Sequence, residues 1–222
     1  MCFSARMSFL AAGLLVSIAI ATYRKIRQFN EIPFASISLA FAIQQALEGA
    51  LWLLLAQGTH PGLTALCMYG FLGFAVVFWP VFIPFALILI EHHPLRRAIM
   101  GFCLIMGSAW SLASLWYLIH VGATVQIQSH HIAYTLPGFE SITGLQLLIL
   151  YSCIVLTPFL VSSDFVLRLA GCLIGVSCLI SYLVWYYYFT SIWCFFAAII
   201  SLAIYAVIIH RNQSTRPKQN AS

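Results

Sequence analysis

The chain has 222 residues, of which 63% are hydrophobic and only 7% are charged, and its formal net charge is +5. A soluble domain carries roughly 25% charged residues, so the composition excludes a water-soluble globule and indicates that lipid is the solvent for most of the surface. The positive charge forms no basic stripe interleaved with aromatic residues, which excludes a nucleic-acid-binding surface.

Seven apolar stretches are long enough to cross a bilayer as helices, which takes about 20 residues each. They lie at about 7–23, 33–57, 63–90, 96–120, 142–162, 165–187 and 190–209. The third stretch is long and contains Trp79-Pro80 and Pro84, which predict a kink or tilt within one helix. Gly171 and Gly175 in the sixth stretch predict close helix packing, within the bundle rather than between chains. The sequence therefore predicts an all-α bundle of about seven transmembrane helices.

The Lys and Arg residues are biased toward one side of this bundle. One side holds Arg24, Lys25, Arg27, Arg96, Arg97, Arg168, Arg211, Arg216 and Lys218. The other side holds only Arg6. The positive-inside rule places the basic side in the cytoplasm. We therefore expect an outer N-terminus, a transmembrane domain over 1–210 and a disordered basic cytoplasmic tail over 211–222.

The apolar start of the chain has a second interpretation, because residues 1–21 resemble a cleaved signal peptide that ends in Ala19-Ile20-Ala21. Cleavage would leave the basic cluster Arg24-Lys25-Ile26-Arg27 outside the cytoplasm, against the positive-inside rule. We therefore expect the first stretch to remain as a transmembrane helix.

The one long outer loop, 122–141, follows the fourth stretch. Residues 124–128 alternate between polar and apolar side chains, residues 132–135 do so less clearly, and Ser129-His130 lies between the two runs. This pattern predicts a short β-hairpin over the outer mouth of the bundle.

Glu48 is the most unusual residue of the predicted spans. It lies in the second stretch, nearer the outer end, where a carboxylate costs roughly 2.5–3.5 kcal/mol on insertion scales. Gln44 and Gln45 lie one helical turn earlier, so the three side chains form one polar face. Two interpretations stay open: a protonated Glu48 that is hydrogen-bonded to a neighbouring helix, or a metal ligand, proton relay or substrate contact.

Cys2 and Cys194 are predicted to lie on the same outer side. Cys2 precedes the first helix and Cys194 lies near the outer start of the last one, whereas the other cysteines lie within apolar runs and behave as small hydrophobic residues. Two thiols on the oxidising side suggest a disulfide or shared metal ligation. Unrelated thiols are the third alternative.

Histidines supply further candidate ligands on the outer side. His120 ends the fourth stretch, and His131 lies in the predicted hairpin beside His130. Imidazole is the commonest metal ligand, although solvated interfacial histidines have the same pattern. No complete zinc or haem motif occurs, so the catalytic residues and the cofactor stay unassigned. A transition metal or haem is what these side chains would bind.

Several motifs resemble a family of uncharacterised bacterial integral membrane proteins. They are Met1-Cys2-Phe3-Ser4-Ala5, Pro33-Phe34-Ala35, Phe41-Ala42-Ile43-Gln44-Gln45 with Glu48-Gly49 and Trp52, and Ser191-Ile192-Trp193-Cys194-Phe195-Phe196-Ala197-Ala198. The resemblance runs the length of the chain. It implies a multi-pass protein of the bacterial inner membrane and no particular activity.

Three functions are therefore considered, and whether the protein is an enzyme stays open. The leading hypothesis is a metal-binding, haem-binding or thiol redox site at the outer mouth, built from Cys2, Cys194, Glu48 and His120 or His131. The second is a non-enzymatic structural, sensor or transport protein stapled by a Cys2–Cys194 disulfide. The third, ranked last because a matching set of intramembrane histidines is missing, is a seven-helix zinc hydrolase similar to the alkaline ceramidases.

Overall fold

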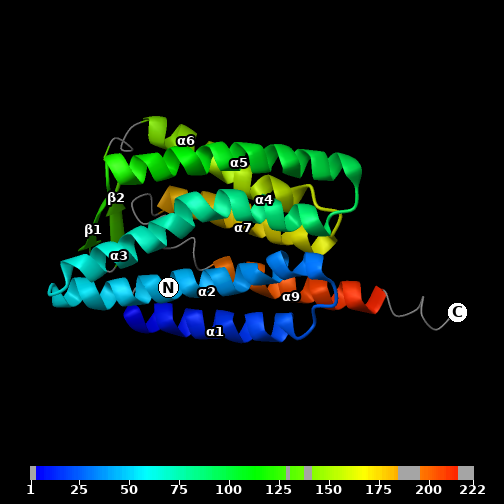
Figure 1. Ribbon diagram of the computed structural model, residues 1–222, viewed down its shortest axis with the longest axis horizontal. Helices are drawn as coiled ribbons and strands as arrows, with labels where there is room; N and C mark the ends of the chain where they lie inside the picture. The colour runs from blue at the N-terminus through cyan, green and yellow to red at the C-terminus, as the bar shows by residue number, and fades with distance from the viewer. Residues whose placement is uncertain (1–3, 129–130, 138–141, 185–195, 215–222) are drawn as a thin grey trace, which may run out of the picture.

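The computed structural model describes residues 4–128, 131–137, 142–184 and 196–214, and its helices lie side by side along one long axis (Figure 1). The elements are α1 (Ala5–Tyr23), the 3-10 turn η1 (Phe29–Glu31), α2 (Ile32–Gln57), α3 (Pro61–Leu72), the π-helical segment η2 (Gly73–Phe78), α4 (Trp79–Ile90), α5 (Pro94–His120), β1 (Thr124–Gln128), β2 (His131–Thr135), α6 (Ile142–Leu160), α7 (Phe165–Val184) and α9 (Phe196–Ser214). With the continuous α3–η2–α4 stretch counted as one, the described residues form seven helices. The predicted all-α class is confirmed.

Four helical stretches of the described residues are long and apolar enough to cross a membrane. They are Ala5–Tyr23, Phe29–Gln57, Pro61–Ile90 and Pro94–His120. Shorter apolar stretches cover Gln146–Leu160, Phe165–Val176 and Ile200–Arg211. Large apolar side chains stay exposed on the outside of the bundle, for example Leu10 at 66% and Ile105 at 69%. Both observations fit a multi-pass membrane protein, in which lipid covers these side chains.

Local sequence signals set the ends of the helices. Ser4 Oγ accepts a hydrogen bond from the Met7 N–H at 3.4 Å and caps α1. Gly58 ends α2 with φ of 65°, a left-handed conformation that glycine adopts without a steric penalty. Pro61 and Pro94 stand in the first turns of α3 and α5, where the missing N–H is not needed.

The predicted distortion of the third stretch takes the form of the π-helical segment η2. The Trp79 N–H binds Phe74 O, five residues earlier, so in this register Pro80, which has no N–H, leaves the Ala75 carbonyl without a helical donor. The next carbonyl, Val76 O, accepts from Trp110 Nε1 on α5 at 3.0 Å. Two neighbouring carbonyls are bound in the same way, Val77 O by Ser111 Oγ at 2.5 Å and Ala75 O by Tyr151 OH at 2.6 Å. The distortion is therefore held by α5 and α6.

The last described helix closes the bundle. α9 packs against α1, α2 and α7, while α4 packs against α2, α5 and α6. The main core is formed by apolar side chains from most of these helices, among them Phe34, Phe159 and Ile204, each 0% exposed. A Cβ on Gly171 would lie 2.8 Å from the Cβ of Phe159, so α7 packs closely on α6 at this glycine.

The bundle has two different ends, and the hairpin forms one of them. β1 and β2 pair antiparallel, with Thr124 opposite Thr135 and Gln128 opposite His131, which confirms the predicted hairpin. Ile132 is 1% exposed, and the Tyr134 ring stacks on Phe71 of α3 with centroids 4.9 Å apart. This end, with the α2–α3 turn and the end of α5, is called the hairpin end.

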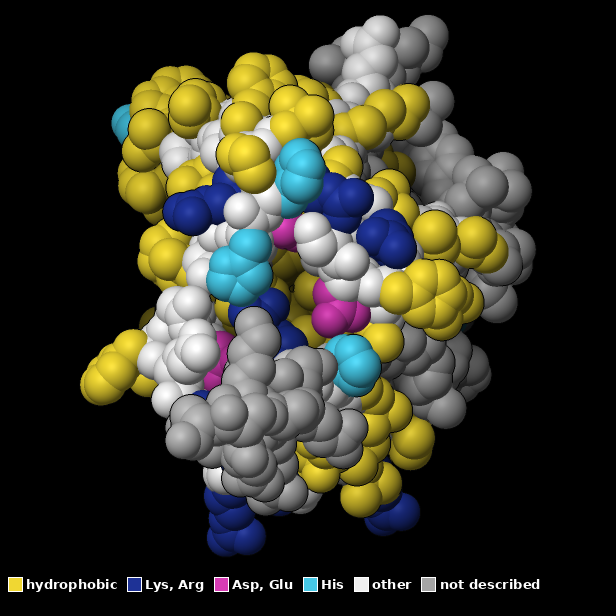
Figure 2. Space-filling model, turned by 90° about the vertical axis from the view of Figure 1, so that its right-hand side faces the viewer, with side chains coloured by type: hydrophobic (Ala, Val, Ile, Leu, Met, Phe, Trp, Pro, Cys, Tyr) yellow, Lys and Arg dark blue, Asp and Glu magenta, His cyan; other side chains and the backbone are white. Residues whose placement is uncertain are grey.

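The basic end is formed by the α1–α2, α4–α5 and α6–α7 turns and by the end of α9. Figure 2 shows Lys, Arg, Asp, Glu and His side chains gathered on this face around a hollow. The described cations here are Arg24, Lys25, Arg27, Arg96, Arg97, Arg168 and Arg211. α9 continues to Ser214, so residues 211–214 extend the last helix where a tail was expected.

Candidate membrane-embedded polar site

Three polar side chains of α2 point into the bundle. Gln44 and Gln45 are each 1% exposed, and Glu48 is 0% exposed. Their spacing of three and four residues places them on neighbouring positions of one helix face. The polar face that the sequence predicts is thus buried, in contrast to the exposed apolar side chains of the same helix such as Ile43 at 46%.

Glu48 receives a long hydrogen bond from its own helix. Gln45 Nε2 donates to Glu48 Oε2 at 3.5 Å, the outer limit for such a bond. Glu48 lies about 24 Å along α2 from Ile32 and about 13 Å from Gln57, at a rise of 1.5 Å per residue. A hydrocarbon core is about 30 Å thick, so a bilayer that α2 crosses would enclose this carboxyl.

Gln44 links this site to the distorted helix. Trp79 Nε1 donates to Gln44 Oε1 at 2.7 Å, and the Trp79 ring stacks on Phe41 with centroids 3.9 Å apart. Trp79 is the first residue of α4 and directly follows the π-helical segment η2. Gln44 therefore ties the polar face of α2 to the residue that directly follows η2.

The predicted histidine ligands lie in different environments. His120 is exposed, stacks on Trp116 with centroids 4.7 Å apart, and places Nδ1 at 2.8 Å from the Trp116 carbonyl of its own helix. His131 is only 9% exposed, within the hairpin. Across the described ranges, Glu48, His120 and His131 belong to no group of three His, Cys, Asp or Glu side chains that could hold a metal ion.

Cys2 and Cys194 form the predicted pair of thiols. Cys2 and Cys194 fall outside the described residues, so their pairing and their distance from Glu48 stay predictions. Within the part that the structure describes, the cysteines that can be placed are all free thiols: Cys67, Cys103, Cys153 and Cys172.

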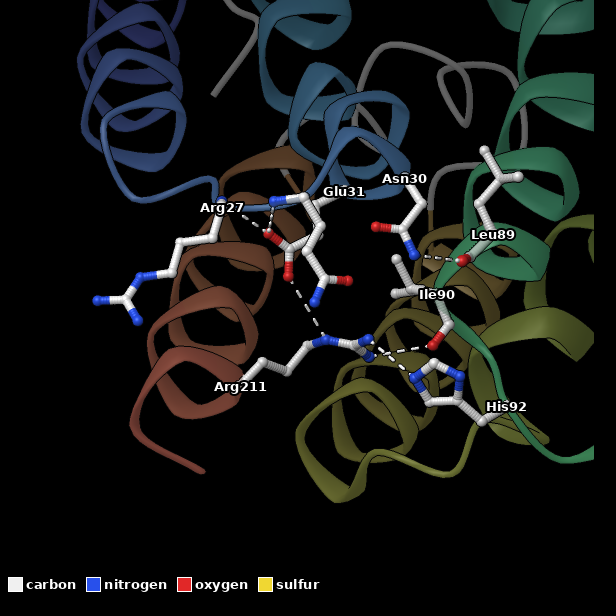
Figure 3. A network of polar contacts seen from close by, with 8 residues as sticks. Arg27, Asn30, Glu31, Leu89, Ile90, His92 and Arg211 are labelled. Carbon is white, nitrogen blue, oxygen red and sulfur yellow. Dashed lines mark hydrogen bonds and ion pairs between the residues drawn. The ribbon is translucent and has the colours of Figure 1, made fainter. Parts of the chain in front are cut away.

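A second polar network lies at the basic end and joins three segments (Figure 3). Glu31, 3% exposed, accepts backbone hydrogen bonds from Arg27 at 3.1 Å and Gln28 at 3.4 Å. Arg211 Nε on α9 lies 3.7 Å from Glu31 Oε1. Arg211 also donates to the Ile90 carbonyl at 3.0 Å and contacts His92 Nε2 at 3.2 Å. The end of α9 is thereby tied to both the α1–α2 and α4–α5 turns.

Glu91 joins two turns in the same region. Its carboxylate accepts from His92 N and His93 N at 2.9 Å each, and from Ser163 N at 2.7 Å and Ser163 Oγ at 2.6 Å. Burial alone would raise the pKa of Glu91, but these four hydrogen bonds favour the charged form, and together they hold its pKa below the ordinary value. Glu91 is thus an ionised structural acceptor.

Glu31, Glu91 and Arg211 are not among the residues that the sequence predicts for a site. A signal existed for the two acids, because each stands just before a proline-started helix, in Glu31-Ile32-Pro33 and Glu91-His92-His93-Pro94. A carboxylate at such a position can accept the free N–H groups of the turn. Nothing local marks Arg211 as the partner of Glu31, since their contact depends on the packing of α9.

Comparison with known proteins gives a family and no activity. The chain matches no curated protein and no solved structure. A family model described as a family of unknown function, DUF6629, matches residues 1–220. The apolar helices, the buried polar face of α2 and this match over nearly the whole length lead to one identification: the chain belongs to the DUF6629 family.

Proposed function

We propose that this protein is a seven-span inner-membrane protein that binds a proton at Glu48, within a transport or sensing role. The N-terminus lies outside the cytoplasm and the basic end lies inside, as the positive-inside rule requires. The observation that carries the proposal is the burial of Glu48, which is 0% exposed in the membrane-embedded part of α2. Ionisable residues at such positions commonly serve ion or proton pathways.

The surroundings of Glu48 favour a proton as the ligand. Its neighbours on the helix face are the neutral amides of Gln44 and Gln45, which can donate to a carboxylate and accept from a protonated carboxyl. Removing the proton leaves a charge in a low-dielectric interior, which is costly. Gln44 lies one helical turn before Glu48 on the same face and holds Trp79 at the start of α4, so we infer that protonation is coupled to the arrangement of α2 and α4.

Infrared difference spectroscopy of the purified protein tests this proposal directly. As the pH is raised, the wild type is expected to lose the carbonyl absorption of a protonated carboxylic acid. Glu48→Gln removes the titrating group and is expected to abolish this signal, and Glu91→Gln, which removes a carboxylate of the basic end, is expected to keep it. A wild-type spectrum without a titrating band, or a band that persists in Glu48→Gln, would contradict proton binding at Glu48.

A metal site at the outer mouth is the second candidate, and the predicted position of Cys2 and Cys194 on the side nearer Glu48 supports it. Thiolates and a carboxylate would suit zinc or another transition metal. Elemental analysis of the detergent-purified wild type would then give about one metal ion per chain, lost in Cys2→Ser, Cys194→Ser and Glu48→Gln. Protein without metal, whose two thiols resist alkylation until reduced, would instead support the disulfide alternative.

A further inference from the structure

The packed faces of α2 and α9 carry a row of buried polar groups that extends from Glu48 to the basic end. Glu31, Ser38 and Gln45 follow one another at seven-residue intervals, so they share a face of the helical stretch. Ser38 is 0% exposed, as is Ser201 on α9. The Glu31–Arg211 ion pair joins the segment just before α2 to the end of α9, and the two helices pack against each other.

Two of these groups have unused hydrogen-bonding capacity. In the described part of the chain, neither Ser38 Oγ nor Ser201 Oγ has a hydrogen-bond partner. Helix hydroxyls elsewhere bind the carbonyl one turn earlier: Thr22 Oγ1 donates to Ile18 O at 2.7 Å and Ser108 Oγ to Leu104 O at 2.8 Å. Ser38 and Ser201 lack that bond, so their hydroxyls are available to water. Buried polar groups of this kind are commonly satisfied by ordered water.

The axial positions of these groups form a graded series. Taking the Glu31–Arg211 pair as the origin and 1.5 Å per residue, Ser38 lies about 10 Å along α2, Ser201 about 15 Å along α9, Gln45 about 21 Å and Glu48 about 25 Å along α2. Water would have to bridge the gaps in this series, and the largest gap is the one of about 10 Å between the ion pair and Ser38. From Ser38 to Glu48, successive polar groups of this series are separated along the axis by about one helical turn of 5.4 Å.

Further unpartnered polar atoms lie between Glu48 and the hairpin end. Ser8 Oγ on α1 and Trp52 Nε1 on α2 are buried at 1% and 9% exposure, and neither has a hydrogen-bond partner in the described residues. Ser8 lies at the height of Gly49 along α2, because the ring of its neighbour Phe9 would be 3.0 Å from a Cβ on Gly49. The polar row therefore continues past Glu48 along α1 and α2.

We propose that this row, defined as Ser8, Trp52, Glu48, Gln45, Ser201, Ser38 and Glu31, is a hydrated route that conducts protons across the bundle through Glu48. The inference rests on the proposed binding of a proton at Glu48. At each step a water or hydroxyl oxygen accepts one proton and releases another to the next oxygen. Glu48 takes up a proton from one side and gives it up to the other, so no bond is left changed and no redox partner is needed.

Arg211 closes the route at the basic end. Its guanidinium pairs with Glu31 and also binds Ile90 O and His92, and a fixed positive charge in a narrow path opposes the passage of a proton. The basic end as a whole is hollowed among charged side chains (Figure 2). The wild type is accordingly expected to conduct slowly, and loss of the Arg211 charge is expected to open the route.

Proton uptake into liposomes under an imposed membrane potential tests the route. Arg211→Gln should take up protons about tenfold faster than wild type, which corresponds to about 1.4 kcal/mol in the barrier. Adding Ser38→Ala and Ser201→Ala to Arg211→Gln should return uptake to the wild-type rate. Using Ser201→Thr in place of Ser201→Ala in that variant restores a hydroxyl and should recover part of the increase. Ser108→Ala is the matched control, since its hydroxyl is bound within its own helix. Arg211→Met, which also removes the positive charge, is a second opening variant in case Arg211→Gln does not fold.

The outcomes separate this inference from the proposed function. Opening variants that fold and show no faster uptake overturn the route, as does a faster uptake that is unaffected by Ser38→Ala with Ser201→Ala. In both cases the infrared signal of Glu48 would still stand, and with it proton binding. Loss of that signal would overturn proton binding at Glu48 itself.

Discussion

Gly107 marks a close approach of α5 to α4. Pro84 has no N–H, so the Pro80 carbonyl one turn earlier has no helical donor, and α5 passes directly over this carbonyl. A Cβ on Gly107 would lie 1.9 Å from Pro80 O. Any side chain at this position must push α4 and α5 apart. α5 carries Trp110 and Ser111, which bind η2, and α4 carries Trp79, which binds Gln44.

We therefore expect Gly107→Ala to lower the free energy of unfolding by about 1–3 kcal/mol, the usual effect of overpacking a buried contact. Thermal unfolding of the detergent-solubilised protein measures it. Gly101→Ala on the same helix is the matched control, because a Cβ there meets nothing within 4 Å, and alanine is the better helix former by up to about 1 kcal/mol. Equal melting temperatures for the two variants would refute the close approach.

Glu91 makes the basic end sensitive to acid. Its folded-state pKa lies below the ordinary value of 4.5, so the ionised carboxylate stabilises the fold above that pH. This contribution is lost as the pH falls through the folded pKa, because protonation removes an acceptor for the four donors.

The expected effect of Glu91→Gln is a loss of about 2–3 kcal/mol at neutral pH, as hydrogen bonds to a charged acceptor are lost. Below the folded pKa, wild type and variant should converge. Unfolding followed at several values between about pH 7 and pH 3 measures both effects. Ser163→Ala, which removes one donor and keeps the charge, should be milder. If the difference in unfolding free energy between wild type and Glu91→Gln does not become smaller in acid, Glu91 is not an ionised acceptor that stabilises the fold.

At the scale of elements, η2 depends on donors that lie far along the chain. Ala75, Val76 and Val77 each give a carbonyl to a side chain of α5 or α6. Pro80 and Pro84 in the sequence predict that the helix is distorted there. They do not predict a π-helical segment, because its shape depends on where Trp110 and Tyr151 arrive after folding.

Removing one of these donors should leave a buried carbonyl unsatisfied. Ser111→Ala is expected to cost about 1–3 kcal/mol of stability, the penalty for such a group. Ser108→Ala, one turn earlier on α5, removes a hydroxyl that binds only a carbonyl of its own helix, and should be nearly neutral. If chemical denaturation places both variants at the same stability, the hydrogen bond to Val77 O is not a structural tie.

For the molecule as a whole, hydropathy and charge in the sequence predicted much of the fold because both act locally. Apolar length indicated the helices, alternation at 124–128 indicated the hairpin, and a lone carboxylate in an apolar stretch marked Glu48. Contacts between helices could not be predicted in this way: Gln44 and Trp79 lie 35 residues apart. Arg211 was expected in a tail because it begins a polar segment, whereas its ion pair with Glu31 keeps it in α9.

The collection of cations at one end of the described bundle leads to a prediction about orientation. The described Lys and Arg residues other than Arg6 lie at the basic end, and moving such charges across a membrane during insertion is costly. In a bacterial host, alkaline phosphatase fused after Ser222 should stay inactive, because it folds only outside the cytoplasm, whereas a fluorescent protein at the same point should fold. The reverse pattern would place the basic end outside, and Glu48 would then lie nearer the cytoplasmic side of the membrane.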